Sequence, residues 1–171
     1  MVLGGGQEGG RRGGTENVPG IVGFGRAAEL AVERLQDVNT RIRALRDKLE
    51  NGISGRIPGT IRNGAAEPRL PNTANLSFEG VEAEGILLLL DQLGICVSSG
   101  SACTSGSLDP SHVLIAMGCS VSRARGSIRF SLSAYNSEAD VDYVLAHLPA
   151  VLAKLRGNQT LSHLRQSFVI P

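Results

Sequence analysis

Cys103 lies in the middle of a run of small polar residues, Ser98-Ser99-Gly100-Ser101-Ala102-Cys103-Thr104-Ser105-Gly106-Ser107, which has no hydrophobic periodicity. A structural free cysteine is usually a small buried hydrophobic residue, and Cys96, between Ile95 and Val97, fits that description better. A thiol on a loop of glycine and serine suits a nucleophile that reaches a substrate and then a second partner, reacting as the thiolate. Such loops are also common as plain connectors, so the composition alone leaves both interpretations open.

The cysteines do not have the spacing of a metal site. Structural zinc sites use pairs of ligands about two to four residues apart, and Cys96, Cys103, His112 and Cys119 contain no such pair. Cys119 follows the end of a predicted helix and also fits a buried structural thiol. Three cysteines are an odd and sparse set, which predicts a reducing cytoplasm and no disulfide framework.

Two further positions could bind an anion. Arg129 alternates with Ile128 and Phe130 in a predicted strand, so its guanidinium could bind a carboxylate in a cleft. The pattern alone favours an ordinary solvent-exposed arginine there, since most arginines are exposed. Gly13-Gly14-Thr15 offers backbone amides and a hydroxyl, but this segment lacks the spacing of a nucleotide-binding loop.

The elements that position these residues follow from hydrophobic periodicity and from the turn residues between the segments. We expect helices over 21–49, with a break near 37–40, over 81–93, over 111–117, and from Asn136 or Ser137 onward with a kink at Pro149. We expect strands over 60–62, 75–78, 95–97 and 127–133. This order predicts an α+β fold with a short, mostly antiparallel sheet covered by helices.

Composition limits the class of protein. The chain has 171 residues, of which 42% are hydrophobic and 19% charged, which is typical of a globular domain. The formal net charge of +1 gives no electrostatic reason to expect a nucleic acid or a membrane as partner. The longest apolar run, Ile86 to Leu90, is far shorter than the roughly 18 residues of a membrane span.

The chain is expected to have three parts. Residues 1–20 are rich in glycine and read as a loop or as a segment of something larger. Residues 21–157 carry the helix and strand patterns and would form the α+β domain. Residues 158–171 are polar and are expected to be a loose tail.

Three blocks of the sequence stand out together, namely Gly4–Glu8 with Arg11–Asn17, Ser98–Ser105 with Leu108–Leu114, and Ser127–Leu132. In their order and spacing they resemble group I cysteine desulfurases, the class V aminotransferase-like enzymes that serve iron–sulfur cluster and nitrogenase assembly. The similarity runs to about Arg156 and is closest to the nitrogen-fixation type. The chain departs from the family at Gly9, where arginine is usual, and at Ser133-Ala134, which replaces a Gly-Arg or Ser-Arg pair.

The resemblance implies the C-terminal part of a pyridoxal-phosphate enzyme of fold type I, with residues 1–20 as a remnant of the large cofactor domain. Cys103 would be the mobile-loop nucleophile that takes sulfur from L-cysteine as a persulfide and leaves alanine. Arg129 would hold the substrate carboxylate. Thr15 would reach across a homodimer interface to the partner's cofactor phosphate.

The same resemblance implies a cytoplasmic homodimer and an iron–sulfur scaffold protein as the sulfur acceptor. Through its persulfide, Cys103 would be the point of any transient contact with an iron–sulfur centre. The loop from Ser99 to Ser107 is expected to be mobile.

The cofactor lysine is the main gap in the resemblance. The family's Schiff-base lysine follows a histidine upstream of the glycine-rich block, whereas Lys48 and Lys154, the only lysines, lie in predicted helices without a preceding histidine. We therefore expect a fragment that lacks this lysine and is inactive alone. The alternative is a non-catalytic remnant that carries sulfur on Cys103 or pairs with other subunits.

Overall fold

The computed structural model describes residues 3–99 and 110–167, with side chains as far as Gly157. The chain divides into two compact units, Met1–Gln36 and Asp37–Pro171, here called unit 1 and unit 2. The boundary expected after residue 20 stays a prediction. The helix α1 (Val18–Glu33) buries none of its residues and therefore stays with unit 1.

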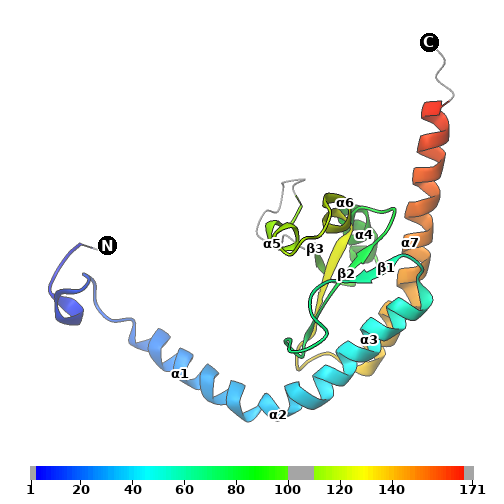
Figure 1. The fold of residues 1–171 in the computed structure, drawn as a ribbon. Helices are drawn as coiled ribbons and strands as arrows, with labels where there is room; N and C mark the ends of the chain where they lie inside the picture. The colour runs from blue at the N-terminus through cyan, green and yellow to red at the C-terminus, as the bar shows by residue number, and fades with distance from the viewer. Residues whose placement is uncertain (1–2, 100–109, 168–171) are drawn as a thin grey trace. The chain divides into compact units, whose positions relative to one another are not determined.

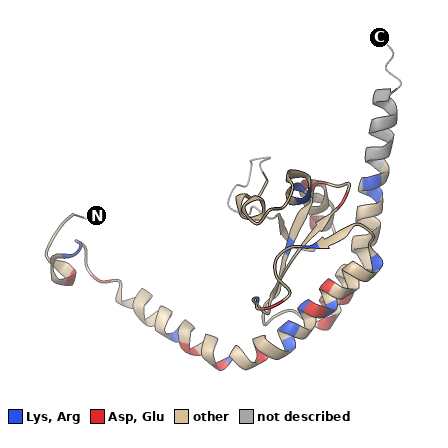
Figure 2. Ribbon diagram, in the orientation of Figure 1, with Lys and Arg blue, Asp and Glu red and all other residues tan. Residues whose placement is uncertain are grey.

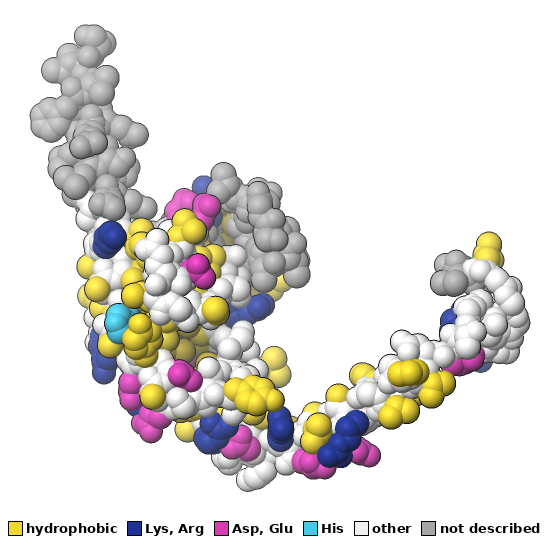
Figure 3. All heavy atoms as spheres, turned by 180° about the vertical axis from the view of Figure 1, so that it is seen from behind, with side chains coloured by type: hydrophobic (Ala, Val, Ile, Leu, Met, Phe, Trp, Pro, Cys, Tyr) yellow, Lys and Arg dark blue, Asp and Glu magenta, His cyan; other side chains and the backbone are white. Residues whose placement is uncertain are grey.

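Unit 1 contains a short 3₁₀ turn, η1 (Gln7–Gly10), followed by α1. The side chain of Asn17 caps α1 by accepting a hydrogen bond from the Gly20 N–H at 3.1 Å. The helix exposes large hydrophobic side chains along its length (Figure 3), namely Val18, Ile21, Val22, Phe24 and Val32. Within unit 1, none of these side chains is buried.

The second half of the predicted helix enters unit 2 through a change of helical geometry. α2 (Leu35–Asp37) leads into a π-helical turn, η2 (Val38–Ile42), and then into α3 (Arg43–Arg56). The predicted break near 37–40 coincides with this turn, which inserts an extra residue into the helical repeat. Beyond it the stripe is buried as predicted, at Ile42, Leu45 and Leu49.

Unit 2 is built on a four-stranded antiparallel sheet in the order β1-β2-β4-β3 (Figure 1). The strands are β1 (Thr60–Arg62), β2 (Thr73–Phe78), β3 (Ser98–Ser99) and β4 (Ser127–Ser131). The predicted antiparallel α+β architecture is confirmed. The third strand was misplaced, however, because residues 95–97 precede the pairing with β4 rather than forming it.

Helices cover the apolar face of the sheet. They are α4 (Ala83–Asp91) and α7 (Glu138–Ser167), together with α3. The core that they share with the sheet is centred on fully buried side chains, among them Ile53, Leu76, Ile86, Ile128 and Leu148. α7 is one helix that contains Pro149 and continues ten residues beyond the expected end at Gly157.

Two short helices follow the cysteine-bearing segment. α5 (His112–Ala116) was predicted, and α6 (Val121–Arg125) was not. α6 directly precedes β4, and the hydroxyl of Ser127, the first residue of that strand, donates to the carbonyl of Ala124 in α6 at 2.7 Å. Each helix begins with a serine cap, Ser111 and Ser120 respectively.

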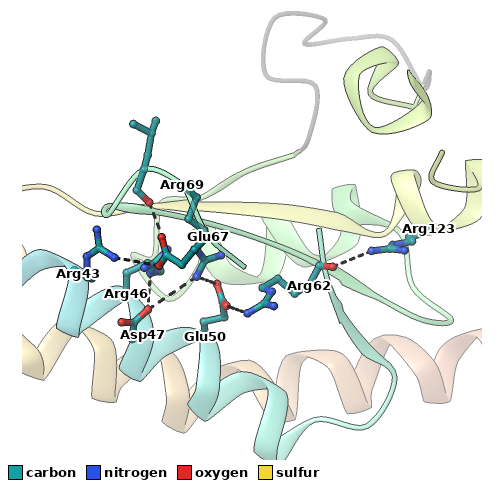
Figure 4. Close-up of polar contacts among 9 residues, drawn as sticks. Arg43, Arg46, Asp47, Glu50, Arg62, Glu67, Arg69 and Arg123 are labelled. Carbon is teal, nitrogen blue, oxygen red and sulfur yellow. Dashed lines mark hydrogen bonds and ion pairs between the residues drawn. The ribbon is translucent and has the colours of Figure 1, made fainter. Parts of the chain in front are cut away.

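A partly buried charge network ties α3 to β1 and to the segment that precedes β2 (Figure 4). Charged residues of both signs are interspersed along α3 (Figure 2). The Glu50 carboxylate, 5% exposed, receives Arg69 at 2.8 Å and Arg62 at 3.2 Å. Arg46, 1% exposed, lies 2.8 Å from Asp47. Opposite charges meet at short range here, so the network fixes the edge of the sheet that carries β1.

Candidate functional site

Arg129 projects from the face of β4 that is turned away from the helical core. Its neighbours Ile128 and Phe130 are buried, while Arg129 itself is exposed, as expected from the alternation of side chains along a strand. No side chain in the described part of the protein forms a hydrogen bond or an ion pair with its guanidinium. The group is therefore available to an external anion.

A transverse row of residues on this face crosses all four strands. Arg129 lies directly opposite Asn75 of β2 on one side and opposite Ser98 of β3 on the other. Asn63, just after β1, continues the row because its N–H donates to the carbonyl of Asn75 at 2.9 Å. Side chains that are directly opposite in antiparallel strands share a face, with Cβ atoms about 5 Å apart. The row therefore gathers polar groups around Arg129.

Asn63 is the buried end of this row and has a complete set of partners. Its side-chain oxygen accepts from Arg123 Nε of α6 at 2.8 Å. Its side-chain nitrogen donates to Asn75 Oδ1 at 2.6 Å and to Ser77 Oγ at 2.8 Å. Arg123 is held in turn by the carbonyl of Arg62 at 2.8 Å (Figure 4). α6 thereby fixes the polar groups on this face of the sheet.

Cys103 and the expected mobile loop around it lie outside the described residues, apart from Ser99 at the start of the loop. The described flanks are anchored: Ser98 and Ser99 pair with β4, and the buried Ser111 caps α5. Cys103 is four residues past Ser99 in the sequence. The segment that carries the predicted nucleophile thus starts from the strand that flanks Arg129.

The other two cysteines differ from the expectation of buried structural thiols. Cys96 is exposed, because its neighbours Ile95 and Val97 turn toward the core and direct it outward. It lines a pocket of about 340 Å³, together with residues of β4 and α7. Figure 3 shows hydrophobic side chains gathered in a hollow on this side of unit 2. Cys119 is half-buried, with its sulfur 3.9 Å from Asn63 Oδ1.

Thr15 lies in unit 1 and is exposed. The glycine-rich block around it folds back on itself, since a Cβ on Gly13 would lie only 2.6 Å from the Gly4 Cα. Arg12 forms ion pairs with Glu8 and Glu16 and donates to the carbonyl of Gly14. Arg12 is therefore occupied by carboxylates of its own segment, and Thr15 and Arg129 belong to different units.

Neither lysine fits the covalent attachment of pyridoxal phosphate. The ammonium group of Lys48 lies 2.7 Å from Asp142 and 2.6 Å from Glu138. The hydrogen bonds that Lys48 donates to Asp142 and Glu138 raise the pKa of Lys48, which favours the charged form over the neutral amine that an imine requires. Lys154 is exposed on α7, in the stretch that follows the core position Leu152. The residues present thus do not complete a cofactor site.

Residues 3–99 and 110–167 contain no group of three or more histidine, cysteine or acidic side chains that could hold a metal ion. The predicted transient iron–sulfur contact at Cys103 lies outside them. No helix among them is long and apolar enough to cross a membrane.

Sequence reasoning missed Asn63, Asn75 and Arg123. Each is an ordinary polar residue in its own segment, and none belongs to the blocks that carry the family resemblance. A partial signal was present at Asn75, since it alternates with Ala74 and Leu76 and so had to lie on the polar face of its strand.

Comparison with known proteins places the chain in a family. The family model for aminotransferase class V matches residues 6–144. A cysteine desulfurase of Gluconacetobacter diazotrophicus is 58% identical over 156 residues, which are 91% of this chain and 39% of the relative. The cysteine desulfurase NifS of Azotobacter vinelandii is 52% identical, over 92% of this chain and 39% of the relative.

Solved structures agree with this placement. A NifS-like protein superimposes with a TM-score of 0.77 at 41% identity, over 91% of this chain and 39% of that one. A NifS-like protein from Rickettsia africae gives a TM-score of 0.77 at 34% identity, over 90% and 39% of the two chains. The chain spans about two fifths of the length of the curated relatives it matches. The chain belongs to the class V aminotransferase family, and its close relatives are cysteine desulfurases.

Proposed function

We propose that this chain is the substrate-binding and sulfur-accepting part of a pyridoxal-phosphate-dependent cysteine desulfurase. The observation that carries the proposal is Arg129, an exposed guanidinium without a partner in the described residues, on a polar row that adjoins the segment leading to Cys103. Guanidinium groups bind carboxylates through two parallel hydrogen bonds. Arg129 would hold the carboxylate of L-cysteine in this way.

Cys103 would accept the sulfur. In the overall transfer, L-cysteine loses its sulfur from Cβ, and Cys103 gains it as a persulfide. The substrate carbon is reduced as its C–S bond is replaced by C–H, while the thiol of Cys103 is oxidised, so L-alanine leaves and no further oxidant is needed. An acceptor protein with its own thiol or an iron–sulfur scaffold would then remove the sulfur.

The remaining parts of the proposal concern the cofactor. Thr15 would contact the cofactor phosphate, in a homodimer that works in the cytoplasm. Because Lys48 is held as an ammonium by two carboxylates, the cofactor lysine would have to come from outside this sequence. The same observation favours a second candidate, a non-catalytic sulfur carrier that displays Cys103.

The test is a chimaera in which this chain replaces the matching segment of the Gluconacetobacter diazotrophicus relative. We expect it to release alanine from L-cysteine and to gain one sulfur atom on Cys103, measured by mass spectrometry of the peptide. An Arg129→Ala chimaera should have a strongly raised KM for L-cysteine. An active chimaera whose KM does not respond to Arg129 would refute the assignment of the carboxylate site. Sulfur uptake without alanine release would favour the carrier.

A further inference from the structure

The hydrogen bonds around Asn63 have a direction that Arg123 imposes. A guanidinium can only donate hydrogen bonds, so the atom of Asn63 that lies 2.8 Å from Arg123 Nε must be the oxygen. The Asn63 nitrogen therefore faces the other way, and its two protons go to Asn75 Oδ1 and Ser77 Oγ. Since Asn63 is only 6% exposed, no water competes freely for these positions.

The orientation of the Asn63 side-chain amide also fixes the orientation of the Asn75 side-chain amide. Its side-chain oxygen is committed as an acceptor from Asn63 at 2.6 Å, so its side-chain nitrogen points away from Asn63. That nitrogen has no hydrogen-bond partner in the part of the chain that the structure describes, and Asn75 is only half-buried. Asn75 therefore presents N–H donors on the same face as Arg129, which lies directly opposite it.

We propose that Asn75 is a second donor to the substrate carboxylate held by Arg129, and that Arg123 and Asn63 are positioning residues that orient its amide. The proposal rests on the proposed role of Arg129 as the carboxylate-binding residue. A carboxylate has two oxygens with about four acceptor positions, more than one side of a guanidinium occupies. A neutral amide adds a donor there without adding a second positive charge.

A purely structural role for Asn75 would not explain why its side-chain N–H donors have no acceptor among the described residues. Asn63, which is structural, uses its oxygen and both of its amide protons within the protein. Among the described residues Asn75 uses only its oxygen, and its remaining N–H donors lie on the face that contains Arg129 and Ser98. The reverse orientation would place an oxygen toward a bound carboxylate and would repel it.

The test uses the 171-residue chain labelled with ¹⁵N and titrated with L-alanine, the proposed product, and with L-alaninamide, which lacks the carboxylate. We expect L-alanine to shift both the Asn75 side-chain amide and the Arg129 Nε–H resonances, with a common affinity. L-alaninamide should shift neither. Asn75→Ala should weaken L-alanine binding by about tenfold, since a hydrogen bond to a charged group is lost. Thr73→Val, on the same face of β2, is the matched control and should leave the affinity unchanged.

A second variant tests whether Asn63 orients the Asn75 amide, and it leaves Asn75 and Arg129 unchanged. In Asn63→Asp, the new carboxylate keeps the contact with Arg123 but can only accept from Asn75, which turns the Asn75 oxygen toward Arg129. We expect about tenfold weaker L-alanine binding, although Asn75 and Arg129 are both intact. The backbone amide spectrum of β2 and β4 should stay as in the unmodified chain, which separates reorientation from loss of structure.

The outcomes separate this proposal from the proposed function. Loss of L-alanine binding in Arg129→Ala, with normal binding in the Asn75 and Asn63 variants, would overturn the second donor and leave the role of Arg129 intact. Binding that survives in Arg129→Ala would overturn both. An unmodified chain whose Asn75 and Arg129 resonances do not respond to L-alanine would also overturn both.

Discussion

Asn75 and Arg129 lie directly opposite each other on neighbouring strands, although 54 residues separate them in the sequence. Each belongs to a strand whose alternate residues are buried in the helical core, so both side chains are directed to the open face of the sheet. The pairing with Ser98 on the third strand connects this pair to the segment that leads to Cys103. One register thus relates the proposed carboxylate-binding residue to the predicted sulfur acceptor.

Cys103 is predicted to be the only cysteine required for sulfur transfer. In the chimaera described above, Cys103→Ser should abolish persulfide formation, because it removes the attacking thiolate. Cys119→Ser and Cys96→Ser should each retain it. Cys96→Ser is the sharper control because Cys96 is exposed, so accessibility alone does not distinguish it from a reactive thiol. Equal loss in Cys103→Ser and Cys96→Ser would contradict the assignment.

The 171-residue chain alone is predicted not to turn over L-cysteine when pyridoxal phosphate is added. The two carboxylates beside Lys48 hold it in the charged form, and Lys154 is an exposed helical residue. The measurement is steady-state alanine release by chain purified from a host that lacks its own desulfurase. Release that disappears in Lys48→Ala or in Lys154→Ala would show that one of these lysines does serve the cofactor.

Glu50 is predicted to be important for stability. Its 5% exposed carboxylate bridges Arg62 and Arg69, so Glu50→Gln removes the counter-charge of Arg62 and leaves Arg69, within the described residues, with only Asp47, 4.0 Å away. We expect a loss of about 2–3 kcal/mol in the free energy of unfolding, measured in urea. This is below the range for a fully enclosed pair, because Arg62 is 42% exposed. Glu67→Gln, which removes the exposed partner of Arg43, should cost less than about 0.5 kcal/mol. Similar losses in the two variants would show that burial does not set the strength of these pairs.

The start of α7 is predicted to lose stability in acid. The Ser137 N–H donates to the Asp140 carboxylate at 2.9 Å, and this hydrogen bond lowers the pKa of Asp140 below its ordinary value. A lowered pKa stabilises the folded chain above the unfolded value, near pH 4, and that contribution is lost as the pH falls through the lower folded value. Asp140→Asn should therefore be less stable than the unmodified chain at neutral pH.

Measurements at acid pH test the direction of the Asp140 pKa shift. The difference between the unfolding free energies of Asp140→Asn and the unmodified chain should stay constant from about pH 7 to pH 5 and shrink below about pH 4. A difference that grows in acid would mean that the Asp140 carboxyl is stabilised in its protonated form.

Local patterns were enough to identify much of the fold. The alternation at Ile128, Arg129 and Phe130 placed Arg129 on the open face of a strand, and the helical spacing of Ile42, Leu45 and Leu49 identified the buried side of α3. The family was also readable from the chain itself, because its motifs are short contiguous blocks. Burial periodicity and motifs are properties of neighbouring residues, so a single sequence contains them.

Other features were decided only by contacts between distant segments. The amide of Asn75 became part of the candidate site because the register of β2 against β4 set it opposite Arg129, and because α6, itself unpredicted, brought Arg123 onto Asn63. Likewise, whether the apolar side chains of α1 are covered depends on what packs against them, and their spacing is the same in either case. Strand register and the direction of a hydrogen-bond chain depend on how separate elements pack, so only the tertiary structure determines them.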